Sequence, residues 1–243
     1  MKFVIVIPAR YQSSRLPGKP LVELSGVPMI VRTYRQCLKA APADSIFVAT
    51  DDEKIKLVCE SYGINVLMTS SNCLTGTDRV AEASKMVEAD VYINVQGDEP
   101  VFNPEDLRSL ISEARQNPDL VINGYCQITD ESQFRSSSTP KVVSRPDGRL
   151  LYMSRAPIPT NKAQGFEQAY RQVCAYAFPK AALLAFTSQQ VKTPLEQIED
   201  IEILRFLELG WDVKMILMSD SSVAVDNPED VIKAEAVIIK LGL

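Results

Sequence analysis

Three cations near the start of the sequence are the first residues able to do chemistry. Arg10, Arg15 and Lys19 follow an apolar run, Phe3–Ile7, which is typical of a buried strand in a parallel sheet. In such sheets a ligand binds beyond the carboxyl ends of the strands, so we expect the cations to bind an anion there. A loop of solvated surface charges is the alternative. Against it, four residues stiffen and shape this loop: Pro8, Pro17, Gly18 and Pro20.

A phosphoryl group is the anion that this loop suits. In-line attack on phosphorus gains mainly from positioning and from neutralising charge on the phosphate oxygens, which Arg10, Lys19 and loop N–H groups could supply. The loop is not a Walker loop, because the sequence G-x-x-x-x-G-K-[ST] is absent.

Two aspartates far apart in the sequence are candidate Mg²⁺ ligands. Asp98 follows the expected strand Asp90–Val95, and Asp226 precedes Asn227 and Pro228. Two carboxylates suit a Mg²⁺ that is completed by substrate phosphates and water. Alternatively, Asp98 is a turn residue and Asp226 a helix N-cap, although Asn227 could be the cap instead.

Composition excludes several classes of chemistry and of partner. The 243 residues include no histidine, which excludes a Ser-His-Asp triad, a Cys-His pair and any His-ligated metal. Five scattered cysteines without a C-x-x-C pair are expected to be reduced thiols. A net charge of −5 gives no basic footprint for nucleic acid or an anionic membrane. With neither a membrane-spanning run nor a signal peptide, we expect a cytoplasmic protein.

Short apolar strands alternate with helices through the first half of the sequence, which predicts an α/β fold with a mostly parallel sheet. The expected strands are Phe3–Ile7, Ser45–Thr50, Asn65–Met68, Asp90–Val95 and Leu120–Gln127. The expected helices are Met29–Ala40, one through Ser61 capped by Asp51 and ended by Gly63, one beginning at Thr77 after a loop with Gly76, and Pro104–Gln116 capped by Asn103.

The pattern changes near residue 130. Asp130–Thr139 is polar, as in a loop or short helical turns, and Lys141–Ser144 and Arg149–Met153 flank a Pro-Asp-Gly turn, as in a β-hairpin. Irregular Pro157–Gln168 and extended Tyr170–Phe178 follow. We expect one domain over residues 1–243 with a β-rich lobe or dimer arm at about 130–180. The remaining elements are helices Pro179–Ser188, Pro194–Leu209 and Pro228–Lys240 and strand Trp211–Met218.

The cationic loop, Pro8-Ala9-Arg10-Tyr11-x-Ser13-Ser14-Arg15-Leu16-Pro17-Gly18-Lys19-Pro20, resembles the signature of the sugar-acid cytidylyltransferases, above all the 3-deoxy-manno-octulosonate (Kdo) family. Further matches follow in order to near the end of the chain. They are Ala49-Thr50-Asp51, Thr75-Gly76-Thr77-Asp78-Arg79, Asn94–Pro100, Lys141-Val142-Val143, Ser154–Pro159, Pro194-Leu195-Glu196-x-x-Glu199 and Val225-Asp226-x-Pro228-Glu229-Asp230.

The resemblance implies a Rossmann-like nucleotidyltransferase fold, with helices on both faces of the sheet, and a homodimer. It implies that the anomeric hydroxyl of a sugar acid attacks the α-phosphorus of CTP, giving pyrophosphate and a CMP-sugar for lipopolysaccharide assembly. The residues implied at the nucleotide are Pro8, Ala9, Arg10, Ser13, Lys19, Thr75, Gly76 and Gln96; Arg10, Lys19 and Asp98 are implied in catalysis, and Asp98 and Asp226 in binding Mg²⁺.

The residues implied at the sugar are Arg15, Gln96, Arg155, Gln172, Tyr176, Glu196 and Glu199. Arg15 and Arg155 are candidates for the sugar carboxylate, which a guanidinium fork fits well. Glu196 and Glu199 are three residues apart on one helix and could both face sugar hydroxyls. A solvated acidic face is the alternative, above all for Glu196.

One departure from the family pattern concerns the sugar. The family usually has histidine where this chain has Gln172, and glycine where it has Cys174. Loss of a titratable cation and gain of an amide oxygen are compatible with 8-amino-3,8-dideoxy-manno-octulosonate, whose ammonium replaces the terminal hydroxyl. We therefore predict this sugar, with Kdo as the alternative. The further alternatives are a sialic-acid cytidylyltransferase and a non-catalytic nucleotide-binding regulator.

Overall fold

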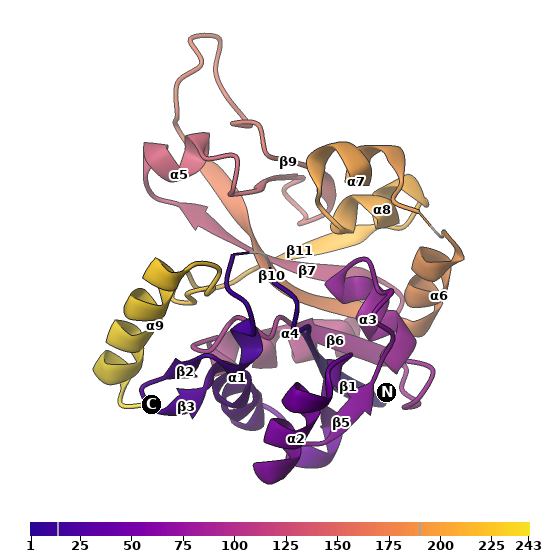
Figure 1. The fold of residues 1–243 in the computed structure, drawn as a ribbon. Helices are drawn as coiled ribbons and strands as arrows, with labels where there is room; N and C mark the ends of the chain where they lie inside the picture. Colours follow the sequence, from indigo (N-terminus) through magenta and orange to yellow (C-terminus); the bar gives the residue numbers. More distant parts are fainter. Residues whose placement is uncertain (14, 190) are drawn as a thin grey trace.

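A nine-stranded sheet forms the centre of the computed structural model, which describes residues 1–13, 15–189 and 191–243. The main path of the sheet runs β11-β7-β10-β6-β1-β4-β5, and β8 and β9 branch from β10. All neighbours on this path are parallel except β10, which is antiparallel to both β6 and β7. The predicted α/β fold with a mostly parallel sheet is confirmed (Figure 1).

The strands are β1 Phe3–Ala9, β2 Glu23–Leu24, β3 Val27–Pro28, β4 Ile46–Thr50, β5 Val66–Met68, β6 Val91–Val95, β7 Val121–Ile128, β8 Lys141–Ser144, β9 Leu150–Ser154, β10 Ala169–Pro179 and β11 Val213–Leu217. The helices are α1 Met29–Leu38, α2 Glu53–Ser61, α3 Gly76–Ala83, α4 Pro104–Gln116, α5 Glu131–Arg135, α6 Lys180–Ser188, α7 Pro194–Glu199, α8 Ile203–Glu208 and α9 Pro228–Leu241. Two 3₁₀ turns, η1 and η2, lie at Lys19–Leu21 and Ala43–Ser45.

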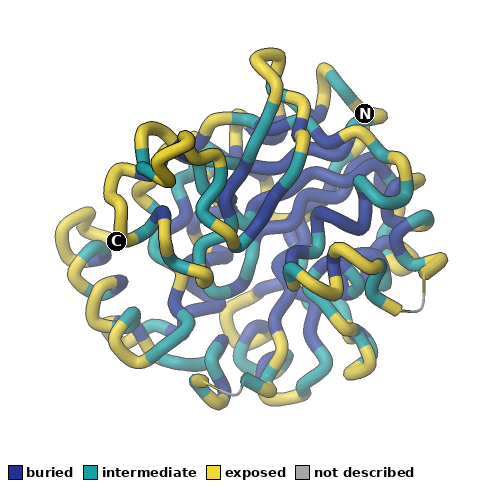
Figure 2. Tube along the Cα trace, turned by 90° about the horizontal axis from the view of Figure 1, so that it is seen from above, coloured by how far each residue is buried: buried dark blue, intermediate teal, exposed yellow. Residues whose placement is uncertain are grey.

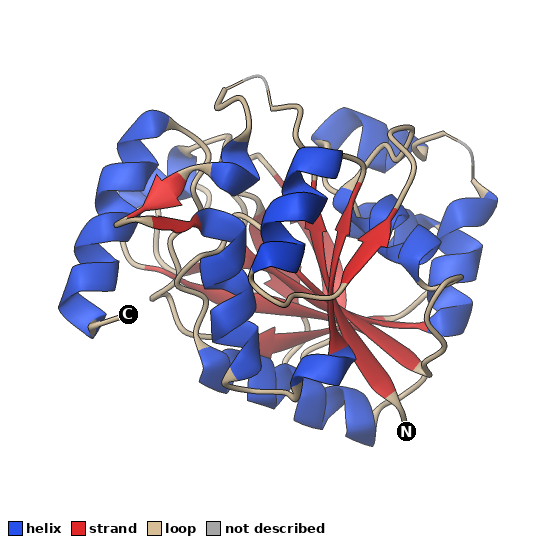
Figure 3. Ribbon diagram, turned by 60° about the horizontal axis from the view of Figure 1, so that its bottom comes forward, coloured by secondary structure: helices blue, strands red, loops and turns tan. Residues whose placement is uncertain are grey.

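Helices cover both faces of the sheet, so the central strands are apolar on both sides (Figure 3). In β1, Ile5 and Ile7 belong to a buried cluster with residues of α1, α2 and α4, whereas Val4 and Val6 belong to a second cluster with residues of α3, α6 and α8. This double burial explains why the run Phe3–Ile7 is continuously apolar rather than alternating. Figure 2 shows the buried strands at the centre, with exposed segments around them.

Helix α9 brings the end of the chain back to its beginning. Its Ala234 and Ile238 pack with Leu24 and Met29, beside β2 and β3 (Figure 1). The backbone N–H of Val225, just before α9, donates to the carbonyl of Asp98 at 2.9 Å. This contact places the segment that carries Asp226 beside the turn that follows β6.

Some of the predicted helices, caps and turns are confirmed and others are wrong. Helix Pro104–Gln116 with its Asn103 cap is confirmed, as is the β8–β9 hairpin. The cap prediction at Asp51 is wrong, because Asp52 accepts from the backbone of Lys54. Gly76 is the first residue of α3 rather than part of a loop, since Thr75 is the N-cap.

The predicted single helix Pro194–Leu209 is also wrong. Asp200 has φ +51°, in the left-handed region, and it ends α7 before α8 begins at Ile203. The periodic pattern of apolar residues continues across this break, so periodicity alone did not reveal it.

The segment expected to form a β-rich lobe is joined to the main sheet. β8 pairs with β10, whose second half lies between β6 and β7. Pro157–Gln168 contains neither helix nor strand. A dimerisation role for this region stays a prediction.

Among the described residues no helix combines the length and apolar character needed to cross a membrane.

Candidate active site

A cavity of about 330 Å³ lies beyond the carboxyl ends of β1 and β6, beside the start of α3. Eleven residues predicted at the site line it: Pro8, Ala9, Arg10, Ser13, Arg15, Lys19, Thr75, Gly76, Gln96, Asp98 and Asp226. The edge of the sheet therefore brings together segments from near the start and near the end of the sequence, from Pro8 to Asp226, as expected at the carboxyl ends of parallel strands.

The cationic loop after β1 folds back on itself. The backbone N–H of Gly18 donates to the carbonyl of Tyr11 at 3.1 Å, and Gly18 has φ +67°, a conformation that glycine adopts without strain. Lys19 then begins the 3₁₀ turn η1. The loop thus turns the Lys19 side chain back toward the ends of β1 and β6.

Lys19 joins the two aspartates. Its Nζ lies 2.5 Å from Asp98 Oδ2 and 3.0 Å from Asp226 Oδ1, and Arg15 pairs with Asp226 at 3.0 Å. Burial lowers the pKa of Lys19, but the ion pairs with Asp98 and Asp226 outweigh this effect and raise its pKa above the ordinary value. The ammonium is therefore charged at neutral pH and holds the two carboxylates together.

The N-terminus of α9 leaves Asp226 available for this cluster. Asn227 is the N-cap of α9, and the Asp230 carboxylate accepts from the backbone N–H groups of Asp226 and Asn227. The alternative in which Asp226 itself caps the helix is wrong.

The two aspartates fit Mg²⁺ in donor type and placement. Both are carboxylates, the hard oxygen ligands that Mg²⁺ prefers, and both face the cavity close to one cationic nitrogen. In the part of the chain that the structure describes, no group of three or more Asp, Glu or Cys side chains gathers to hold a metal. A Mg²⁺ here would therefore share its coordination with phosphate oxygens and water.

Two glycines allow the cavity walls to approach one another. A Cβ on Gly97 would lie 2.8 Å from the carbonyl oxygen of Pro8, and one on Gly76 would lie 3.0 Å from Gln96 Nε2. Side chains at these positions would push β6 away from β1, or α3 away from Gln96. At Gly97 glycine is therefore needed for close packing rather than for its backbone conformation, whereas at Gly76 the end of the Gln96 side chain could move aside.

A third wall of the cavity comes from the segment around α7 and α8 and was not predicted. Lys192, Asp200 and Glu202 line the cavity. Glu202 continues the three-residue spacing of Glu196 and Glu199, a signal that could have revealed it, whereas no pattern singles out Lys192 or Asp200. The other lining residues that were not predicted are Pro20, Met29, Cys73, Leu74, Arg79 and Gly97.

Arg155 and Glu199 are placed differently from their prediction at the sugar. The Arg155 guanidinium donates to the carbonyls of Glu199, Ser137 and Asp200. The Glu199 carboxylate accepts from Tyr152, Ser154 and the backbone of Arg155. These bonds tie β9 to α7, and neither side chain is among those that line the cavity.

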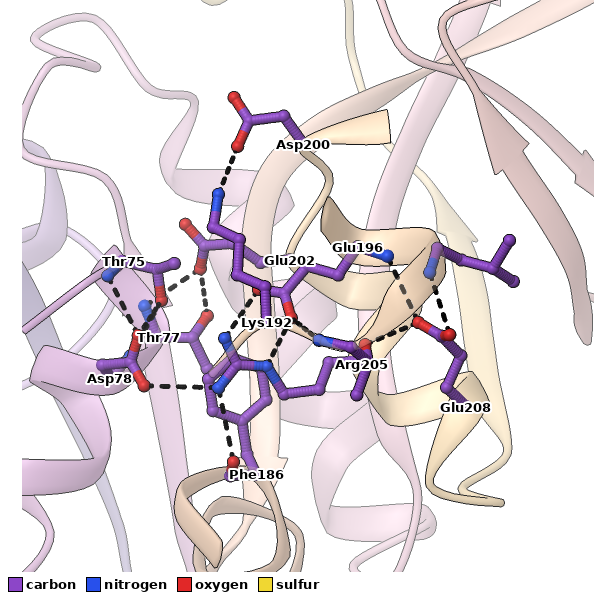
Figure 4. Close-up of polar contacts among 12 residues, drawn as sticks. Thr75, Thr77, Asp78, Phe186, Lys192, Glu196, Asp200, Glu202, Arg205 and Glu208 are labelled. Atoms are coloured by element: carbon purple, nitrogen blue, oxygen red, sulfur yellow. Dashed lines mark hydrogen bonds and ion pairs between the residues drawn. The ribbon is translucent and has the colours of Figure 1, made fainter. Parts of the chain in front are cut away.

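Glu196 is neither solvated nor directed into the cavity, which corrects both interpretations of it. Its side chain is fully buried and forms a bidentate pair with Arg205, with oxygen–nitrogen distances of 2.5 and 2.7 Å (Figure 4). Arg205 is also fully buried and lies 3.7 Å from the centre of the Phe186 ring. Glu196 is thus committed to a structural ion pair.

Gln172 and Tyr176, predicted at the sugar, belong to a buried polar network on β10, and neither side chain is among those that line the cavity. The Nδ2 of Asn123 donates to the carbonyls of Val173 and Ala175, so its Oδ1 must face Gln172. Gln172 Nε2 therefore donates to Asn123 Oδ1 at 2.9 Å and to the Tyr176 hydroxyl at 3.2 Å. This leaves Gln172 Oε1 without a hydrogen-bond partner among the described residues.

The family of this chain follows from its similarity to known proteins. A family model described as Cytidylyltransferase matches residues 4–216. The chain is 40% identical to the 3-deoxy-manno-octulosonate cytidylyltransferase of Chloroherpeton thalassium, with 99% of each chain covered. It is 36% identical to that of Escherichia coli, with 98% of this chain and 96% of the other covered. The chain belongs to the 3-deoxy-manno-octulosonate cytidylyltransferase family.

Other relatives extend the comparison. The chain is 38% identical to the 8-amino-3,8-dideoxy-manno-octulosonate cytidylyltransferase of Shewanella frigidimarina, with 97% of this chain and 98% of the other covered. A solved CMP:2-keto-3-deoxy-manno-octonic acid synthetase complexed with CTP has a TM-score of 0.93 at 35% identity, covering 99% of this chain and 100% of that one. The predicted nucleotidyltransferase fold and enzyme class are confirmed.

Proposed function

We propose that this chain transfers CMP from CTP to the anomeric hydroxyl of 8-amino-3,8-dideoxy-manno-octulosonate. The hydroxyl oxygen bonds to the α-phosphorus, the bond from that phosphorus to the bridging oxygen of pyrophosphate breaks, and the hydroxyl proton is released to water. Family membership and the likeness to a synthetase complexed with CTP support the reaction class. We expect the CMP-sugar to serve lipopolysaccharide assembly.

The phosphate side of the cavity suits this transfer. Arg10, Ser13 and Lys19 are the residues that we propose for the triphosphate, since charge develops on its oxygens as pyrophosphate leaves. Asp98 and Asp226 would hold Mg²⁺. A bound Mg²⁺ would neutralise phosphate oxygens and lower the pKa of a hydroxyl close to it.

The orientation of Gln172 is the observation that favours the 8-amino sugar. Asn123 and Tyr176 take both hydrogen bonds of its amide nitrogen, so the atom that remains is an acceptor. A neutral acceptor suits an ammonium, whereas a protonated histidine at this position would repel it.

Kdo is the second candidate, and the names of the relatives favour it. The relatives from Chloroherpeton thalassium and Escherichia coli, at 40% and 36% identity, carry the Kdo name, and the relative with the 8-amino name lies between them at 38%. Overall identity therefore does not separate the two sugars, and the choice depends on the pocket.

The test is pyrophosphate release with CTP and each sugar, in the natural chain and in Gln172→His. We expect the natural chain to prefer the 8-amino sugar and Gln172→His to lower that preference by about tenfold, equivalent to one lost favourable contact. Activity with Kdo and none with the 8-amino sugar would overturn the sugar assignment while leaving the reaction class intact.

A further inference from the structure

The wall of the cavity formed around α7 and α8 carries a cation of its own. Lys192 precedes α7, Asp200 ends it, and Glu202 is the N-cap of α8; all three line the cavity. We propose that Lys192 is a substrate-binding residue that pairs with the carboxylate of the sugar acid, with Asp200 as the residue that positions it. This inference rests on the proposed function, but it does not depend on which of the two sugars is used.

Lys192 is held by Asp200 while keeping donors for a ligand. Its Nζ lies 2.5 Å from Asp200 Oδ1, and its side chain is 24% exposed (Figure 4). An ammonium has three N–H donors, and Asp200 takes one of them. The hydrogen bond from Lys192 lowers the pKa of Asp200, so the Asp200 carboxylate is ionised at neutral pH.

Asp200 sits on a fixed backbone. It has φ +51°, a left-handed conformation that aspartate tolerates better than most residues. Its N–H donates to the carbonyl of Glu196 at 2.8 Å, and its own carbonyl accepts from Arg155. The backbone is therefore held on both sides, while the side chain is 70% exposed and can meet a ligand.

A buried network holds this wall against the start of α3. Arg205 on α8 pairs with Glu196 on α7 and approaches Asp78 on α3 at 3.5 Å. The Glu202 carboxylate accepts from the backbone N–H groups of Gly76 and Thr77, and Figure 4 shows Glu202 beside Thr77. Lys192 and Asp200 therefore face the cavity from a rigid support, and little ordering is needed when a ligand binds.

The charges on this wall suit a sugar acid better than a triphosphate. One ammonium stands with two carboxylates, Asp200 and Glu202, so a polyanion would be repelled overall. A sugar acid has a single carboxylate for Lys192 and several hydroxyls, whose O–H groups can donate to Asp200 and Glu202. The cations proposed for the phosphates, Arg10 and Lys19, come from a different segment, the loop after β1.

Lys192 can also bind the sugar carboxylate, a role that was predicted for Arg155. The guanidinium of Arg155 is used by three backbone carbonyls, and its side chain is not among those that line the cavity. Lys192 contributes to the same wall and does line it. The sugar carboxylate can therefore be received by Lys192.

The experiment compares Lys192→Met with Lys180→Met, a control whose ammonium pairs with Glu88 outside the cavity. KM for CTP and for each sugar, Kdo and its 8-amino form, are measured by pyrophosphate release. We expect Lys192→Met to raise the KM for the sugar by about 10- to 100-fold, the worth of a charge-assisted hydrogen bond. The KM for CTP should change by less than about twofold, and Lys180→Met should match the natural chain.

Two further variants separate binding from support. Lys192→Arg should recover part of the lost affinity for the sugar because it keeps the charge, and Asp200→Asn should raise the KM for the sugar less than Lys192→Met does. An unchanged sugar KM in Lys192→Met, or an increase confined to CTP, would overturn the role of Lys192. Absence of pyrophosphate release by the natural chain with either sugar would instead overturn the proposed function.

Discussion

Replacing Arg205 by methionine tests whether the ion pair beneath the α7–α8 wall is as fully desolvated as its geometry indicates. Both Arg205 and Glu196 are completely buried, and the pair is bidentate. In Arg205→Met the Glu196 carboxylate keeps its burial and loses its counter-charge. A buried charge left without its partner typically costs about 3–5 kcal/mol of unfolding free energy.

Because Arg205 makes further contacts, we expect Arg205→Met to lower the free energy of unfolding by an amount in the upper part of that range. The guanidinium also stacks on the Phe186 ring and donates to the Phe186 carbonyl, and both contacts vanish in the variant. For a chain of 243 residues, this loss lowers the unfolding temperature by on the order of 10 °C. Urea unfolding followed by circular dichroism gives the free energy directly.

Two companion variants make the result decisive. Arg149→Met removes one partner of a half-exposed pair with Asp212 and should cost less than about 1 kcal/mol. The double variant Arg205→Met with Glu196→Met removes both buried charges and should recover most of the lost stability. If Arg205→Met costs no more than Arg149→Met, the interpretation of a desolvated, supporting ion pair is refuted.

Two further predictions concern the turn after β6. Asp98→Asn should reduce turnover by at least about 100-fold and weaken the dependence of the rate on Mg²⁺. Its circular dichroism spectrum should match that of the natural chain. Near-normal turnover in this variant would contradict the assignment of Asp98 as a Mg²⁺ ligand. Burial, with the charge of Asp98 adding to it, raises the pKa of Glu99 from 4.5 to about 7. Because the folded state then binds this proton more tightly, stability worth about 3 kcal/mol is present below pH 4.5 and is lost as the pH rises through 7. Urea unfolding of the natural chain and of Glu99→Gln without Mg²⁺ should show this slope only in the natural chain, and equal slopes would contradict the shifted pKa.

The phosphate side of the site was predictable because strand ends fix it. Asp98 directly follows a buried strand, and Arg10 and Lys19 follow another, so a parallel sheet must bring them to one edge. The structure places all three around one cavity with Asp226. Their roles with CTP and Mg²⁺ stay predictions.

The sugar side could not be predicted in the same way, because it depends on partners that no local pattern reveals. Spacing placed Glu196 and Glu199 on one helical face. However, Arg205 buries Glu196, and the hydroxyls of Tyr152 and Ser154 engage Glu199. The break of the helix at Asp200 was equally hidden, since the apolar periodicity continues across it.

The cavity-lining role of Lys192 has no signal in the sequence at all. It lies in a short connection before α7, and it reaches the cavity only because α7 ends at Asp200 and α8 packs against the start of α3. Residues of this kind become visible only once the tertiary structure is known.

The most direct test of the proposed reaction is to incubate the purified chain with CTP, Mg²⁺ and either Kdo or its 8-amino form, and to measure both pyrophosphate and the CMP-sugar by mass spectrometry. We predict equimolar pyrophosphate and CMP-sugar, with neither formed when the sugar is omitted or when ATP replaces CTP. Absence of a CMP-sugar with both sugars, or release of pyrophosphate without any sugar, would contradict the proposed reaction.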